Sequence, residues 1–147
     1  MGKYYIKKHY NTGEEYPGPE GVHFTARACR AAEKFAACRG FLLYEAGSAG
    51  KTGLAGSKRV YGYGHILAGP LKLEEARVVR GKEYLYLVQV EVEITLKNKM
   101  RGIPLVVLRE QYGVSLRPSL GGIEEISEAA FREMKGQLDA AWEGEQR

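Results

Sequence analysis

Residues 39–67, RGFLLYEAGSAGKTGLAGSKRVYGYGHIL, decide how this chain folds. The apolar run at 41–46 is typical of a buried strand. A loop of Gly, Ser and Lys follows, and residues 54–67 then mix glycine, tyrosine and basic side chains in a second long strand. Glycines inside a strand often mark a bulge or the close approach of another backbone. The stretch therefore predicts a β-hairpin whose tip can approach a polyanion, which suits binding more than a reaction.

The chain has the size and composition of one ordinary domain. It has 147 residues, of which 44% are hydrophobic and 27% charged with both signs present, so it can build a core. We expect a single domain spanning residues 1–147. The formal charge of +4 and the pI of about 9.0 are mildly basic and permit an anionic partner without requiring one.

The sequence gives no sign of a membrane span or of secretion. It has no apolar run of about 18 residues, and its first ten residues lack the apolar core of a signal peptide. Cys29 and Cys38 lie nine residues apart in a segment that reads as helix, roughly 13 Å along the axis. That separation excludes a disulfide. We expect a cytoplasmic protein whose two cysteines are small apolar side chains.

The N-terminal third reads as strand, loop and helix. Residues 3–8 form a short strand, and residues 11–21 carry three glycines and two prolines, as expected of a loop. Thr25 can cap a helix that runs to about Cys38 and stops at Gly40.

Several short strands follow the hairpin. Residues 71–81 are polar and could hold a helical turn, whereas residues 84–94 alternate strictly and predict the clearest strand. Residues 103–108 read as an edge strand or the entry to one, because Pro104 interrupts them, and 113–116 read as another short strand. This order predicts an α+β fold: a small, mixed, mostly antiparallel sheet forming a partly closed barrel with flanking helices.

A last helix begins at Ser127. Ile126 and Phe131 are spaced as a hydrophobic staple around that cap. The apolar stripe expected to be buried comprises Phe131, Met134, Leu138 and Trp142.

Motifs for catalysis and metal binding were sought and rejected. Residues 47–52, GSAGKT, look like the end of a phosphate-binding loop, but Glu45 stands where the pattern needs glycine. The histidines have no neighbouring nucleophile at a known spacing. Asp139 is the only aspartate, so clustered carboxylates for metal or proton transfer are missing. We expect no catalytic residue, metal or cofactor in this domain.

The chain resembles PUA-like domains of the EVE type, which are related to YTH domains. The resemblance rests on the tyrosine-rich opening (Tyr4, Tyr5), on Gly-Val-His at 21–23, on Arg-Gly followed by an apolar strand to Tyr44, and on the returning strand. Gly-Ile-Pro-Leu at 102–105 and the last helix also fit. Phe41 replaces the family's usual aspartate, and Glu20 replaces a frequent tryptophan.

The resemblance implies a PUA-like barrel that binds DNA or RNA, often through a modified base turned out of its strand. Similar domains serve as specificity modules of modification-dependent restriction systems, so a fused or partner effector enzyme is implied as well. Base flipping costs a few kcal/mol, and stacking on an aromatic ring returns about 1–3 kcal/mol per base.

Residues matching the family's pocket give the expected site. Stacking rings would come from Tyr10, Phe24 and Tyr44, although Phe24 and Tyr44 also suit the core. Hydrogen bonds to the base edge would come from Asn11, His23 and Ser48. Phosphates would meet the basic residues Lys51, Lys58, Arg59, Lys97, Lys99, Arg101 and Arg117.

Two other functions remain open. The related ASCH branch includes amide hydrolases that use Lys, Glu and Tyr, but its Gly-x-Lys-x-x-Glu-x-Arg signature is missing here. Other PUA-like branches are protein-interaction modules, which an exposed apolar patch would favour.

Overall fold

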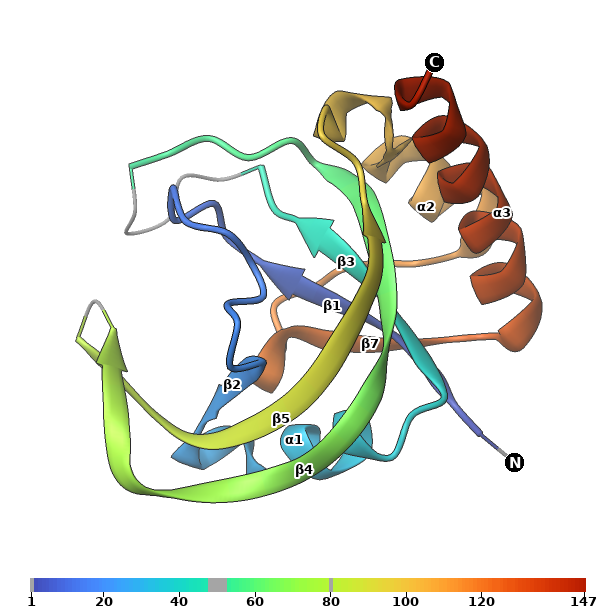
Figure 1. The fold of residues 1–147 in the computed structure, drawn as a ribbon. Coiled ribbons are helices and arrows are strands. Elements are labelled where there is room, and N and C mark those ends of the chain that lie inside the picture. The colour runs from blue at the N-terminus through green and yellow to red at the C-terminus, as the bar shows by residue number, and fades with distance from the viewer. Residues whose placement is uncertain (1, 48–52, 80) are drawn as a thin grey trace.

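The computed structural model describes residues 2–47, 53–79 and 81–147. One strongly curled sheet carries helices on both of its faces (Figure 1). The strands are β1 (Tyr4–His9), β2 (Val22–Thr25), β3 (Gly40–Glu45), β4 (Arg59–Val79), β5 (Lys82–Thr95), β6 (Ile103–Pro104) and β7 (Ile123–Ile126). The helices are α1 (Cys29–Ala36), α2 (Leu105–Tyr112) and α3 (Glu128–Glu145), with short 3-10 turns η1 (Ala26–Ala28), η2 (Lys99–Arg101) and η3 (Leu120–Gly122).

The strand order is β2-β5-β4-β3-β1-β7, with β6 paired to β4. Only β1 and β3 run parallel, so the expected mixed, mostly antiparallel sheet is confirmed. A parallel pair needs a crossover, and β2 with α1 supplies it. Because β1 and β3 are parallel, their last residues, His9 and Glu45, lie opposite each other. We call this end of the two strands the β1–β3 edge.

Irregularities in β4 make the sheet curl into an open half-barrel rather than a closed one. Its pairing with β5 shifts register four times between Tyr63 and Arg77, and such bulges bend a strand and increase its twist. Gly64 permits close contact at one shift, because a Cβ there would lie 2.2 Å from the carbonyl oxygen of Glu91. The expectation that glycines mark close backbone approach is confirmed for this strand.

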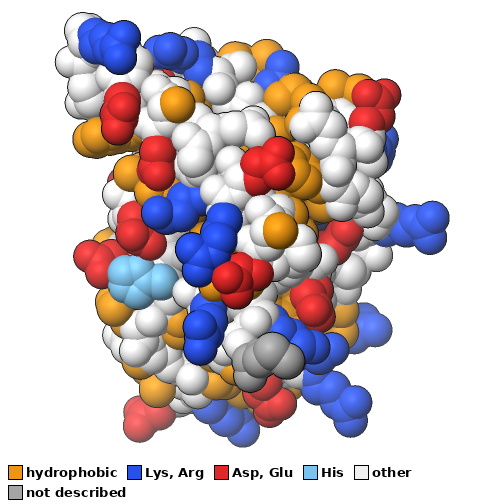
Figure 2. All heavy atoms as spheres, turned by 90° about the vertical axis from the view of Figure 1, so that its right-hand side faces the viewer, with side chains coloured by type: hydrophobic (Ala, Val, Ile, Leu, Met, Phe, Trp, Pro, Cys, Tyr) orange, Lys and Arg blue, Asp and Glu red, His pale blue; other side chains and the backbone are white. Residues whose placement is uncertain are grey.

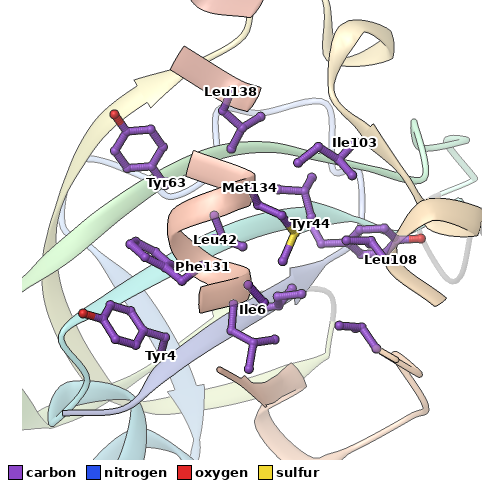
Figure 3. Packing of buried hydrophobic residues seen from close by; sticks show 14 of the residues in the cluster. Tyr4, Ile6, Leu42, Tyr44, Tyr63, Ile103, Leu108, Phe131, Met134 and Leu138 are labelled. Carbon is purple, nitrogen blue, oxygen red and sulfur yellow. The ribbon is translucent and has the colours of Figure 1, made fainter. Parts of the chain in front are cut away.

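Each face of the sheet has its own apolar core. The α1 side packs Phe35 against Phe41 and Tyr61, all at most 2% exposed. The other side packs Leu42 and Tyr44 against α2 and α3 (Figure 3). Because both faces are covered, β1 and β3 are buried along nearly their whole length.

The strands expected at 3–8, 41–46 and 84–94 and the Ser127 cap are confirmed. The Ser127 hydroxyl accepts a hydrogen bond from the Ala130 amide at 3.0 Å. The predicted stripe holds for its first three residues, whereas Trp142 is 37% exposed. Thr25 precedes η1 without a side-chain cap bond, and both cysteines are free.

Three predictions of local structure are wrong, one of them only in part. Residues 71–81 are not a helical turn, because β4 continues through Pro70; this proline lies at a register shift, where no ladder hydrogen bond is required. The edge strand expected at 103–108 is present only as β6, Ile103–Pro104, which pairs with β4. From Leu105 the chain forms α2 instead: Pro104 is its N-cap residue, and Gly113 ends it with φ 65°. Residues 113–116 are irregular, and the strand lies at β7 instead.

No helix in the described ranges combines the length and apolar character needed to cross a membrane.

Candidate nucleic-acid interface

The ends of β1 and β3 bring two loops together. The Ala46 amide donates to the His9 carbonyl at 2.8 Å, so the loop after β1 and the arm after β3 leave the sheet side by side. Asn11 ties them together, since its side-chain amide donates to the Ala55 carbonyl at 2.9 Å and its oxygen accepts from the Gly13 amide. Tyr10 is 42% exposed at this edge.

A buried aromatic cluster supports this edge from the α1 side of the sheet. His9 stacks on Tyr16 with ring centroids 3.9 Å apart, and its Nε2 lies 2.7 Å from the Tyr61 hydroxyl. Burial lowers the pKa of His9 to about 4 and raises that of Tyr61, so both are neutral near pH 7. Since Nδ1 faces the Tyr10 carbonyl, we assign the proton to Nδ1 and let Tyr61 donate to Nε2.

An ion pair completes the cluster. Lys99 Nζ lies 2.6 Å from Glu45 Oε2 and 4.5 Å from the centre of the Tyr61 ring. Burial alone would raise the pKa of Glu45, but hydrogen bonds from Lys99 and the Ser57 amide outweigh it and hold the pKa below its usual value. The charge of Lys99, expected to meet a phosphate, is therefore already offset inside the protein.

The opposite face of the same edge carries unpaired positive charge. Burial raises the pKa of Tyr44, while the nearby positive charges of Arg109 and Arg59 act against this rise. Arg109 and Arg117 line one open cavity of about 410 Å³ with the turn at 113–115. Lys8 lies beside Tyr44 in the β1–β3 register. We call Lys8, Lys58, Arg59, Arg109 and Arg117 the basic surface.

Among the described residues, no carboxylate forms an ion pair with any member of the basic surface. The face that carries α3 differs, because acidic and basic side chains are interspersed across it (Figure 2). Arg132 with Glu128 and Lys135 with Asp139 are pairs of this kind. The cations at the β1–β3 edge are therefore free to meet an anion, as are other described cations outside the ion pairs, such as Arg30 and Lys34 of α1.

The expected stacking rings do not converge on one pocket. Phe24 is 1% exposed in the α1-side core, where Lys7 lies over its ring at 5.2 Å. Tyr44 is 3% exposed and packs in the cluster with Leu108, with only its hydroxyl directed away from the centre (Figure 3). The core alternative for both residues is the arrangement found, and Tyr10 alone of the three presents its ring to solvent.

His23 lies away from the other expected contacts. It is on β2, opposite Leu87, and its Nε2 is 3.3 Å from a Glu20 carboxylate oxygen that also binds Arg77. Burial, followed by the charge of Arg77, lowers the pKa of His23.

Lys97 and Arg101 are exposed around η2, where Glu145 accepts hydrogen bonds from the Lys97 and Asn98 amides. Ser48 and Lys51 lie outside the described residues.

Sequence reasoning missed Arg109 and the cluster around His9. Arg109 could not be assigned to the site from sequence, because the segment that leads to it was expected to be a strand and not a helix. The alternation of β1 gave a misleading signal, since Lys7 and His9 would be placed outside if only one face were buried. Among the described residues, no group of three or more His, Cys, Asp or Glu side chains is placed to hold a metal ion.

No protein-family model and no curated protein sequence matches the chain. The assignment of a function therefore depends on the geometry of this edge and on the sequence resemblance.

Proposed function

We propose that this domain binds nucleic acid at the edge formed by the ends of β1 and β3. The single observation that carries the proposal is the basic surface: Arg59 and Arg109 lie near Tyr44, and Arg109 and Arg117 line the open cavity. Among the described residues, none of these three arginines pairs with a carboxylate. Phosphate contacts supply most of the affinity in such complexes and need no particular base. Tyr10 is exposed at the same edge and would stack on a base.

We further propose that the half-barrel is a PUA-like domain of the EVE type that reads a modified base. The resemblance in sequence and the parallel β1–β3 pair inside an otherwise antiparallel, curled sheet support this. Tyr10 would then contact the base, and the buried cluster of His9, Tyr16 and Tyr61 would support the β1–β3 edge from the α1 side of the sheet. In this role the domain would act in the cytoplasm, with a fused or partner effector enzyme.

Binding of labelled oligonucleotides tests both proposals, the binding of nucleic acid and the recognition of a modified base. The duplexes and single strands would differ only at one central base: unmodified, N6-methyladenine, 5-methylcytosine or 5-hydroxymethylcytosine, each at two salt concentrations. A preference for one modified base that Tyr10→Ala removes is expected. Equal, salt-dependent binding of all four would reduce the function to unspecific phosphate contact, and no binding at low salt would refute it.

The phosphate contacts are tested by Arg109→Gln. We expect binding to weaken about ten-fold, since a charge-assisted hydrogen bond contributes roughly 1.5–3 kcal/mol, and the slope of log affinity against log salt to fall by about one. Arg132→Gln is the matched control, because Arg132 is already paired with Glu128 on α3. Equal effects of the two substitutions would show that only net charge matters.

A hydrolase remains the second candidate because of one contact set. Lys99, Glu45 and Tyr61 lie together beside the same edge, and amide hydrolysis in the ASCH branch uses these residue types. Water would add to the amide carbonyl and the amine would leave with a proton. Turnover of an N-acylated nucleoside that Lys99→Met removes would favour this candidate; no turnover would leave the binding function.

A further inference from the structure

A second surface of opposite charge lies along an open edge of β5. On that side β2 pairs with β5 only as far as Val88. Within the described ranges no strand pairs with this side of residues 89–95. An unpaired strand edge presents alternating N–H and C=O groups, which can accept an added strand from another chain.

The edge forms one wall of a groove. The cavity has a volume of about 310 Å³, which is at the lower end for ligand-binding pockets. Val92, Glu93, Ile94 and Thr95 line one side, Glu15, Tyr16 and Pro17 line the other, and Trp142 of α3 contributes its ring. We call this the β5-edge groove.

The charge of the groove selects a cationic occupant. Among the residues that the structure describes, its lining contains the carboxylates of Glu15 and Glu93 and no lysine or arginine. Glu93 keeps 42% of its side chain exposed while holding one nitrogen of His65. The Trp142 ring is 37% exposed, and an indole face attracts ammonium and guanidinium groups.

A second copy of this chain fits the edge poorly. If two β5 edges paired antiparallel about Glu93, the two Glu93 side chains would face each other directly. Like charges opposite each other in a sheet are destabilising. A segment with lysine or arginine opposite Glu93 would instead place positive charge beside its carboxylate.

The geometry points to a peptide-binding site: the β5-edge groove takes an extended, basic segment of a partner protein as an added strand. Backbone hydrogen bonds to residues 92–95 hold the segment, and Glu15, Glu93 and Trp142 select lysine or arginine side chains. The proposal does not rest on nucleic-acid binding, because no residue of the groove belongs to the basic surface; Tyr16 is shared only with the buried cluster beneath the β1–β3 edge.

Trp142 provides the readout, since it is the only tryptophan of the chain. The full chain would be titrated with a capped hexapeptide of alternating valine and lysine, up to about 1 mM. We expect a saturable change in tryptophan emission and slowed amide exchange at residues 92–95. A glutamate version of the peptide and a version N-methylated on alternate residues, which cannot donate to the edge, should each bind at least about ten-fold more weakly.

Substitution of Glu93 by Gln should weaken the lysine peptide about two- to five-fold, as for an exposed ion pair. Glu75→Gln is the matched control, because Glu75 is an exposed glutamate of β4 outside the groove. The proposal is overturned by the absence of saturable binding, by equal binding of the N-methylated peptide, or by equal effects of both substitutions. An emission change that depends on protein concentration alone would overturn it in favour of self-association.

Discussion

At the scale of single residues, the burial of His9 predicts how the free energy of unfolding changes with pH in mild acid. Burial lowers its pKa from 6.5 to about 4, so the unfolded chain binds a proton in this interval that the folded chain refuses. The stabilisation is complete above pH 6.5 and is lost as the pH falls toward 4, by up to about 1.4 kcal/mol per pH unit. His9→Gln should flatten this dependence in urea unfolding between pH 5 and 6.5. His23→Gln, at a less buried site, should change it less; an unchanged slope in His9→Gln would contradict the assignment.

The burial of Lys7 predicts a change of the free energy of unfolding at neutral to alkaline pH. Its ammonium donates to the carbonyls of Gly121 and Lys8, at 2.8 and 3.1 Å, and burial lowers its pKa from 10.5 to about 7. Between these values the unfolded chain holds the proton and the folded chain does not, so stability should rise from pH 7 to 9. Lys7→Met should remove most of that rise in urea unfolding. Lys3→Met, at an exposed lysine, is the control, and a rise that survives Lys7→Met would exclude Lys7 as its source.

At the scale of elements, the bulged β4 depends on glycine. Gly64→Ala would place a methyl group 2.2 Å from the Glu91 carbonyl oxygen and 2.9 Å from the Phe41 ring. We expect a loss of about 1–3 kcal/mol in unfolding free energy, because β4 and β5 must separate. Gly136→Ala is the matched control, since nothing lies within 4 Å of the new methyl group in α3. That substitution should stabilise the protein by about 0.5–1 kcal/mol, and similar losses in both would contradict the close approach.

A comparison of β4 with β5 and α3 shows which elements could be predicted from sequence. The alternation at 84–94 and the Ser127 cap are local signals, and the structure has them where they were expected. The course of β4 past Pro70 depends on the register shift against β5, which no local pattern encodes. Likewise, Pro104 is compatible with an edge strand and with the start of a helix, and the packing of Leu108 into the core decides for the helix.

At the scale of the whole molecule, the candidate site was predictable only in part. The meeting of the loops after β1 and β3 was expected only through the family resemblance, which placed Tyr10 and Tyr44 in one pocket. The burial of Phe24 and Tyr44 was not decided by sequence, because an aromatic residue in a strand suits a core or a pocket equally. Arg109 joins Arg59 at Tyr44 only through the docking of α2 on β3, which is a tertiary contact.

The whole molecule also predicts that its two charged surfaces act independently. The basic surface carries positive charge, whereas the β5-edge groove carries carboxylates, and the two share no residue. An oligonucleotide and the lysine peptide should therefore bind together, each with an affinity within about two-fold of its value alone, because additivity holds for separate sites. Anisotropy of a labelled oligonucleotide, read with and without saturating peptide, measures this. Arg109→Gln should weaken binding of the oligonucleotide only, and Glu93→Gln should weaken binding of the peptide only. Mutual displacement would mean either that both ligands compete for one surface or that the peptide captures the oligonucleotide in solution. A mixture of oligonucleotide and peptide without protein distinguishes these two explanations.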